Sequence, residues 1–411
     1  MPKSLKISLL AISVLLIVFV FLGGFLPAHV RAGSEQNAYQ QIEVYSEVLQ
    51  HIQNDYVVTP NIPDVTTGAL HGLLEGLDPD SGYLTAAEYQ KYQAKQGHEP
   101  AQIGVHISKR YGYATVVSVV PGGPADKAGV IDGDVIETID GQGTRVMPLQ
   151  LIQAQLAGEP GTNVKVSVIE PTSAKPVMLT LTRAVAAYPP LHTDEYENSS
   201  ILYLKPYDMQ PQRVDAVLDH IRSAEKGGKQ KLLLDLRDVS GGDMPSALRL
   251  ANAFLSSGTI ATLQGQKFST QTFSADPKQF VTAAPLIVLV NHGTSGPAEI
   301  VAAALKDNHR AQLVGDRTFG SGALQHQISM PDGAVLFLSV AKYHAPDGAV
   351  IQETAVIPNV QVSEGGINGM PLPPPTAVTK PGAPASANPA PTPAPDDQLQ
   401  KALSLLKTQA A

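Results

Sequence analysis

The sequence of 411 residues contains no cysteine and no tryptophan, and aromatic residues make up only 5% of it. The missing cysteines exclude disulfide bonds, thiolate catalysis, cysteine-ligated zinc and a bacterial lipoprotein anchor. Because aromatic residues are scarce, the hydrophobic cores must be built mainly from Val, Leu, Ile and Ala. The chain is long enough for roughly two to three domains, each with its own core.

Positive charge is also sparse, since the net charge is -8 and the isoelectric point is near 5.8. No basic stripe is present, which argues against nucleic acid as a partner. The 11 histidines are dispersed, and neither a His-x3-His pair nor a carboxylate cluster has metal-ligand spacing. The glycine-rich runs lack a P-loop or a dinucleotide fingerprint. We therefore expect neither a metal nor a cofactor.

Charged residues are absent from the apolar run 7–26, which Lys3 and Lys6 precede. The run is long enough to cross a bilayer and longer than the ~7–15 residues of a secretory signal, which favours an uncleaved anchor. A signal peptide remains the alternative, because residues 30–32 have cleavage-type spacing. Both interpretations place the rest of the chain outside the cytoplasm, in a bacterial cell envelope.

Changes in residue pattern divide the chain into segments of different kinds. Short β-rich runs give way to strands that alternate with helices, and this alternation predicts a largely parallel sheet. A Pro/Ala-rich stretch predicts an extended spacer, and the last helix is too short to be stable without packing. The segments are an anchor or signal peptide (1–32), a helical N-terminal region (33–98), a mainly β domain (99–186), an α/β core (187–365), a Pro/Ala-rich linker (366–396) and a short C-terminal helix (397–411).

The mainly β domain contains the run GGPADKAGVIDGDVIETIDG, residues 122–141, which resembles a PDZ domain. Such domains add an extended peptide beside an edge strand and hold its terminal carboxylate with backbone amides. By position, Ile103, Gly104 and Val105 form that carboxylate loop. The resemblance implies extended peptides or protein C-termini as ligands. The alternative is a PDZ fold that only packs against its neighbour.

The run NHGTSGPAEIVAAALKDNHRAQLVGDRTFGSGALQ, residues 291–325, resembles the active-site segment of the carboxyl-terminal processing peptidases. These tail-specific serine proteases have the pattern N-x-G-[ST]-A-S-A-[SA]-E-I…G-x-x-T-F-G-K-G-x-x-Q. The resemblance covers most of residues 40–362 and includes the turn LDPDSGYL, residues 77–84, which is similar to the family's LDPHSSYL. It implies a ClpP/crotonase-like α/β core with an inserted PDZ domain.

The same resemblance assigns catalytic positions. In the family the middle serine is the nucleophile, the lysine is its base and the glutamine orients the lysine; here these positions hold Gly296, Ser321 and Gln325. The turn at Gly241 and Gly242 matches the family's DLRxNPGG turn, which supplies an oxyanion-hole amide. The second amide belongs to the residue after the nucleophile, which here is Pro297 and has no N–H.

Three functions remain open from the sequence. The first is a catalytically degenerate protease that binds peptides or protein C-termini, with an active protease, a substrate or an envelope protein as its partner. The second is an active serine endopeptidase in which Ser295 pairs with His292 or His326. The third is an envelope scaffold. Ser321 cannot act as a base at neutral pH, so whether the chain is an enzyme stays undecided here.

Overall fold

The computed structural model describes residues 28–95, 101–110, 112–171, 173, 175–227, 231–363 and 396–409. The chain separates into two compact units, residues 1–69 and 70–411. In the part of the chain that is described, no helix is both long and apolar enough to cross a membrane. The apolar run 7–26 and nearly all of the predicted linker 366–396 lie outside the described residues.

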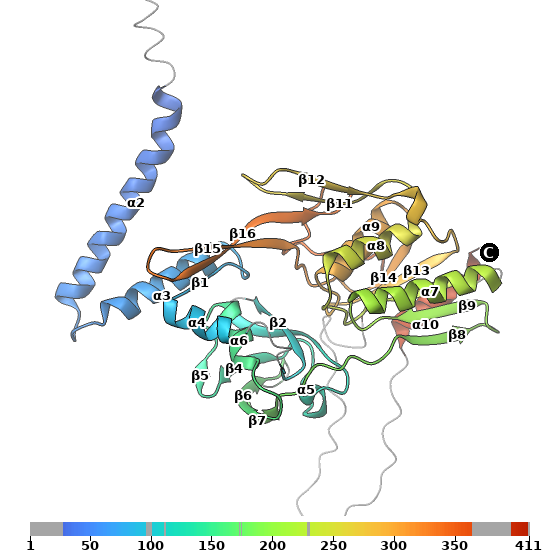
Figure 1. The fold of residues 1–411 in the computed structure, drawn as a ribbon, viewed down its shortest axis with the longest axis horizontal. Helices are drawn as coiled ribbons and strands as arrows, with labels where there is room; N and C mark the ends of the chain where they lie inside the picture. The colour runs from blue at the N-terminus through green and yellow to red at the C-terminus, as the bar shows by residue number, and fades with distance from the viewer. Residues whose placement is uncertain are drawn as a thin grey trace, which may run out of the picture. The chain divides into compact units, whose positions relative to one another are not determined.

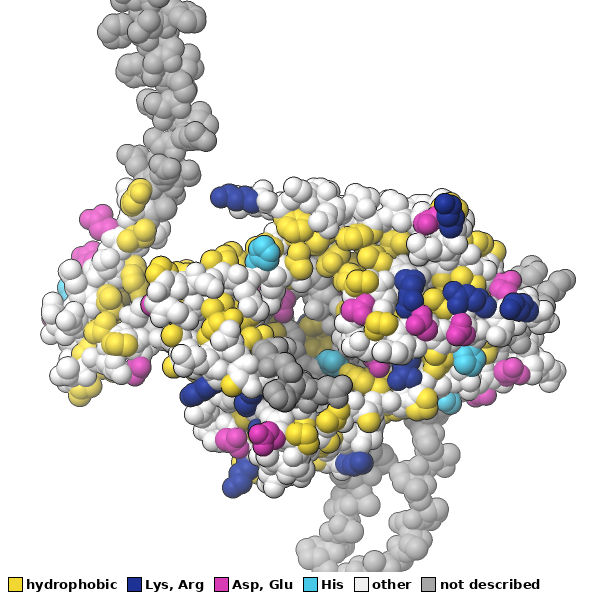
Figure 2. Space-filling view, viewed as in Figure 1, with side chains coloured by type: hydrophobic (Ala, Val, Ile, Leu, Met, Phe, Trp, Pro, Cys, Tyr) yellow, Lys and Arg dark blue, Asp and Glu magenta, His cyan; other side chains and the backbone are white. Residues whose placement is uncertain are grey.

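The first unit contains α2 (Ala28–Asp55) and the beginning of α3 (Ile62–Glu75). Large hydrophobic side chains lie exposed along α2, among them Tyr39, Ile42 and Val48, and Figure 2 shows hydrophobic side chains along this helix. The predicted helical region is therefore helical in this unit, although its helix leaves much apolar surface uncovered.

The PDZ-like part of the second unit is a sheet in the order β2-β3-β4-β6-β7, with β5 beside β4. Its elements are β2 (Val105–Arg110), β3 (Tyr113–Val119), α5 (Pro124–Lys127), β4 (Val135–Ile139), β5 (Gln142–Gly143), α6 (Leu149–Leu156), β6 (Asn163–Ile169) and β7 (Val177–Thr182). Among the described residues β2 pairs only with β3. The other edge of β2 is therefore open to an added strand.

The α/β core is built on a sheet in the order β17-β14-β13-β10-β9-β8. Figure 1 labels β8, β9, β13 and β14 of this sheet. Its strands are β8 (His192–Tyr196), β9 (Ile201–Lys205), β10 (Lys231–Asp235), β13 (Leu286–Val290), β14 (Gln312–Gly315) and β17 (Val360–Gln361). All neighbours are parallel except β8, which runs antiparallel to β9. The predicted α/β core with a largely parallel sheet is confirmed.

Helices cover both faces of this sheet. Successive side chains of a strand point to opposite faces, so Leu232 and Leu234 pack with one set of helices while Leu233 packs with another. One face carries α7 (Pro211–Gly227), α8 (Met244–Phe254) and α9 (Pro297–Asp307), and the other carries α10 (Asp397–Thr408). The C-terminal helix thus finds the packing partner that its short length requires.

A further sheet joins the lead-in region to the core. It has the order β1-β16-β11-β12, with β15 also beside β16. Its strands are β1 (Gly82–Leu84), β11 (Thr259–Gln264), β12 (Gln271–Ser274), β15 (Ala323–Ser329) and β16 (Val335–His344). The helix α4 (Ala86–Ala94) follows β1, and the short 3-10 helix η1 (Pro277–Gln279) follows β12. The predicted helical lead-in therefore includes a strand. Three residues have no detectable period, and only pairing with a distant strand makes them β.

Candidate active site

The loop between β13 and α9 places Gly296 at the position predicted for the nucleophile. Its backbone has φ 59° and ψ -120°, a conformation that residues with a side chain rarely adopt. A Cβ added there would meet no atom within 4 Å. Pro297 follows as the first residue of α9 and offers no N–H. The turn therefore has the room for a nucleophile, but its residue supplies no reactive group.

A buried carboxylate joins this turn to the position predicted for the base. One oxygen of Glu299 accepts hydrogen bonds from the amides of Gly296 (3.0 Å) and Ser321 (2.7 Å). The other oxygen accepts from the Gly320 amide (2.7 Å) and the Thr318 hydroxyl. Glu299 is fully buried, and burial raises its pKa to about 7 although these donors oppose the shift. Sequence reasoning missed this role; the only signal was the glutamate of the family pattern.

Replacing Glu299 by glutamine is expected to lower the free energy of unfolding by about 2–3 kcal/mol at neutral pH. The amide nitrogen would face N–H donors where a carboxylate oxygen accepted two hydrogen bonds. Chemical denaturation measures the loss. The exposed Glu195→Gln is the control and should change stability by less than about 0.5 kcal/mol. Equal effects of the two changes would contradict the bridging role.

The turn at Gly241 and Gly242 retains hydrogen-bond donors for an oxyanion. Gly242 has φ 117°, and a Cβ there would lie 2.3 Å from the carbonyl carbon of Met209, so only glycine fits. The carbonyl of Gly241 accepts from the Met209 amide at 2.8 Å. Among the described residues, no hydrogen bond uses the amide of Gly241 or Gly242. These two amides are therefore available for the role predicted for them, whereas Pro297 has no N–H to offer.

The histidines are not assembled with Ser295. Ser295 is buried, its amide donates to the carbonyl of Val239 at 2.9 Å, and no hydrogen bond of the described residues joins its hydroxyl to a histidine. Burial lowers the pKa of His292, against the charge of Asp316, and His326 is exposed on β15. Within the described ranges, no group of three His, Asp or Glu side chains could hold a metal ion.

Gln325, predicted to sit where the family orients its lysine, has a different partner. Its side-chain amide donates to the carbonyl of Asp80, which also accepts from Gln150 at 2.6 Å. Gln352 donates to the Asp80 carboxylate at 2.8 Å and accepts from the Gly322 amide at 2.6 Å. These amides tie the LDPD turn of the lead-in region to the turn that carries Ser321.

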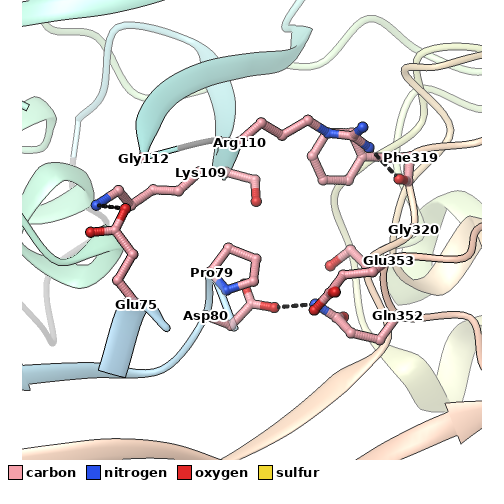
Figure 3. Close-up of a pocket in the computed structure, with 12 residues that line it drawn as sticks. Glu75, Pro79, Asp80, Lys109, Arg110, Gly112, Phe319, Gly320, Gln352 and Glu353 are labelled. Carbon is pink, nitrogen blue, oxygen red and sulfur yellow. Dashed lines mark hydrogen bonds and ion pairs between the residues drawn. The ribbon is translucent and has the colours of Figure 1, made fainter. Parts of the chain in front are cut away.

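A cavity of about 470 Å³ opens beside Ser321 (Figure 3). Its wall combines Asp80 from the lead-in region, Lys109 from β2 and Phe319 and Glu353 from the core. Figure 3 shows these side chains around an open centre, with Lys109 paired away from it to Glu75 at 3.2 Å. The missing lysine side chain of the family would have space here.

Replacing Asp80 by asparagine is expected to stabilise the protein at pH 7.5 and not at pH 3.5. Burial, helped by the charge of Asp78, raises the pKa of Asp80 from 3.8 to about 6. A raised folded-state pKa contributes stability that is present below the unfolded value and lost as pH rises through the folded value. The gain should be on the order of 2 kcal/mol, as measured by urea denaturation at both pH values. The exposed Asp215→Asn serves as control, and a gain independent of pH would refute this origin.

Two side chains of the edge strand β2 contact the α/β core, one at the turn of Gly241 and the other at the turn of Phe319. His106 shares a hydrogen bond of 2.5 Å with the Tyr188 hydroxyl, and both side chains lie 3.1 Å from where a Cβ of Gly241 would be. The guanidinium of Arg110 lies 4.3 Å from the ring centre of Phe319 and donates to its carbonyl at 2.5 Å. The PDZ-like domain is thus in direct contact with the turn at Gly241 and Gly242 and with the turn at Phe319, which carries Ser321.

The predicted carboxylate loop lies at the end of a groove between β2 and α6. Ile103 and Val105 line its cavity of about 360 Å³, whereas Gly104 lines a neighbouring cavity of about 560 Å³. The groove also contains Lys95, whose ammonium donates to the carbonyl of Ala157 at 2.8 Å and whose pKa burial lowers. No hydrogen bond of the described residues uses the amides of Ile103 or Gly104.

Comparison with known proteins identifies the same two domains, a peptidase core and a PDZ domain. Residues 200–362 match the model of peptidase family S41, and residues 115–170 match that of the PDZ domain. The chain is 29% identical over 361 residues to a carboxy-terminal-processing protease of Bartonella bacilliformis, covering 85% of this chain and 82% of the relative. It is 30% identical over 301 residues to a carboxyl-terminal-processing protease of a Picosynechococcus species, covering 72% of each.

A solved structure supports the fold as well. The photosystem II D1 C-terminal processing protease superposes with a TM-score of 0.64 at 26% identity. The match covers 78% of this chain and 92% of that one. The PDZ domain and the α/β core therefore have a known fold.

Proposed function

The chain belongs to the carboxyl-terminal processing serine proteases of peptidase family S41, and on this premise we propose that it is a catalytically degenerate member that binds polypeptide C-termini. One observation carries the proposal. Glu299 brings the nucleophile and base positions to a single carboxylate oxygen, yet those positions hold Gly296 and Ser321. A protease fold that keeps the positions of these two turns without a nucleophile or a base is suited to binding polypeptides rather than to acyl transfer.

The groove between β2 and α6 supports the binding half of the proposal. The free edge of β2 can pair with an extended peptide, and the cavity beside it can hold alternate side chains. The amide of Ile103 and the ammonium of Lys95, which both line this cavity, are suitable donors for a terminal carboxylate. A peptide with a free C-terminus is therefore the ligand that this chemistry favours.

The cellular place of this binding is part of the proposal. The apolar run 7–26 supports a single N-terminal membrane segment or a secretion signal in a bacterial cell envelope, with the bulk of the chain outside the cytoplasm. Unfolded envelope proteins, an active protease or another envelope component are the partners that fit. Protease accessibility of the intact chain in spheroplasts tests the orientation; full protection would overturn it.

Fluorescence polarisation of labelled decapeptides tests the binding. Peptides with apolar C-terminal residues should bind the full chain in their free-acid form and at least about tenfold more weakly as C-terminal amides. Lys95→Gln should weaken the free acids and leave the amides unchanged. Lys91→Gln in α4, the helix that Lys95 caps, is the matched control, because Lys91 is exposed and lies outside the groove. Equal affinity for acids and amides would count against C-terminus recognition.

The loss of catalysis has its own test. The full chain should show no labelling by a fluorophosphonate probe and no hydrolysis of unstructured peptides. If it does label or hydrolyse, and Ser295→Ala abolishes the activity, the chain is instead an endopeptidase with rearranged residues. The two tests are independent, so binding and degeneracy can fail separately.

A further inference from the structure

The cavity beside Ser321 has a carboxylate in its wall that no cation neutralises. Within the described ranges, the carboxylate of Asp80 accepts one hydrogen bond, from Gln352 at 2.8 Å, and forms no ion pair. Asp80 is partly buried, and a carboxylate that leaves water without a cation or a full set of donors is costly. Asp80 therefore lacks a counter-ion at a place where the cavity leaves space for one.

The two cations of the cavity wall are committed to other partners. The ammonium of Lys109 pairs with Glu75 at 3.2 Å and donates to two backbone carbonyls, each at 3.0 Å. The guanidinium of Arg110 lies over the ring of Phe319 and donates to the carbonyl of the same residue. Neither cation forms an ion pair with Asp80, so the negative charge of the cavity is not compensated from within the wall.

The other groups of the wall suit an organic ammonium. Glu353 adds a second carboxylate and Ser321 a hydroxyl, and together with Asp80 they offer acceptors to the three N–H bonds of a primary ammonium. Figure 3 shows Asp80 and Glu353 at the edge of the cavity. Pro79 and the Phe319 ring supply apolar surface for an alkyl stem. The volume of about 470 Å³ lies within the roughly 300–1,000 Å³ of small-molecule pockets.

We propose that this cavity binds the primary ammonium of an alkylamine, with the carboxylate of Asp80 as its counter-ion. A hydrogen bond from an ammonium to a carboxylate is short and strong, and here it would replace a missing partner. The cavity shares no lining residue with the groove between β2 and α6, so this site does not depend on the recognition of C-termini. A lysine side chain of a polypeptide and a free amine both carry the required chemistry.

Isothermal titration calorimetry of the full chain in detergent tests the site with two amines. Nα-acetyl-lysine methylamide represents a polypeptide lysine, and n-pentylamine represents a free amine. At least one should bind about tenfold or more tightly than the same molecule with its amine acetylated, because acetylation removes the charge. The amine that binds more tightly identifies the source. If neither amine binds better than its acetylated form, the proposal is wrong.

Amine binding should weaken roughly tenfold between pH 7.5 and pH 5, because only ionised Asp80 attracts a cation. Burial and the charge of Asp78 raise the pKa of Asp80 to about 6, Glu353 adds to the rise, and Gln352 and Lys342 oppose it. The amines stay protonated at both pH values. An affinity that does not change over this range would contradict Asp80 as the counter-ion.

Two variants show whether the amine occupies this cavity. Asp80→Asn, which is expected to gain stability at neutral pH, should weaken amine binding at least about tenfold. Ser321→Lys should do the same, because the substituted side chain brings an ammonium of its own into the cavity. The exposed Asp215→Asn is the matched control and should bind the amines as the natural chain does. Amine binding that survives either cavity change would lie elsewhere and overturn the proposal.

The groove variant Lys95→Gln keeps the two binding sites apart. It should leave amine binding unchanged while it weakens the free-acid peptides, and Asp80→Asn should have the opposite pattern. Failure of the amine site and failure of C-terminus recognition are therefore distinguishable. An equal loss of amine binding in Lys95→Gln and in Asp80→Asn would count against a separate site.

Discussion

Replacing Arg237 by leucine is expected to lower the free energy of unfolding by about 3–5 kcal/mol at pH 7. Asp235, its partner, has no exposed surface, and Arg237 is the closest cation to it. Burial opposes ionisation, but the charges of Lys205 and Arg237 hold the pKa of Asp235 below its usual value. Among the described residues, leucine would leave the buried carboxylate with Lys205 at 4.0 Å, the Tyr203 hydroxyl at 2.7 Å and the backbone amide of residue 237 at 3.0 Å.

Urea denaturation of the full chain measures this loss, and Arg249→Leu is its matched control. Arg249 forms an equally short pair with Asp215, 2.7 Å, but both side chains are more than a third exposed. Such pairs contribute about 0–1 kcal/mol. A depressed folded-state pKa gives stability that is lost as pH falls, so the difference between the two variants should shrink toward pH 3. A loss in Arg237→Leu no larger than in the control would refute the buried ion pair as a major support.

The combined change Gly296→Ser, Pro297→Ala and Ser321→Lys is expected to supply the serine, the lysine and the second amide of the family, and with them serine peptidase activity. The turn at Gly296 has room for a Cβ, and the cavity beside Ser321 has room for a lysine side chain. Glu299 already holds the two positions together. Alanine at 297 returns the second amide of the oxyanion hole.

Fluorophosphonate labelling and peptide hydrolysis should rise at least about 10³-fold over the natural chain in the triple variant only, because groups that act as a unit are strongly non-additive. A triple variant with Gly296→Ala in place of serine supplies the control, since it keeps the base and the amide but has no nucleophile. A triple variant that keeps the circular dichroism spectrum of the natural chain and still does not react with the probe would contradict the prediction that these three groups are sufficient for activity.

The local residue pattern was sufficient to predict the architecture and to show that the family's lysine is replaced by Ser321. The alternation of strands and helices indicated a largely parallel sheet, and the TFGSG turn indicated both the family and the absence of its lysine. Such features depend on residue type and on the periodicity of single helices, strands and turns, which sequence displays directly. The helix at the C-terminus was also predictable, together with its need for a partner.

Long-range contacts were beyond reach from sequence. Glu299 and Ser321 lie 22 positions apart, and Gln325 and Asp80 lie 245 apart, so their hydrogen bonds exist only because separate elements pack together. The strand β1 was missed for the same reason.

By itself, then, the sequence determined the family, the order of its elements and which residues stand at the positions where the family has its nucleophile, base and second amide. Only the tertiary structure decided that the turns of Gly296 and Ser321 meet at Glu299, that β2 of the PDZ domain lies against Gly241 and Phe319, and that α10 covers the other face of the sheet. The physical reason is that reactive groups are properties of single residues, whereas burial and contact are properties of packed surfaces.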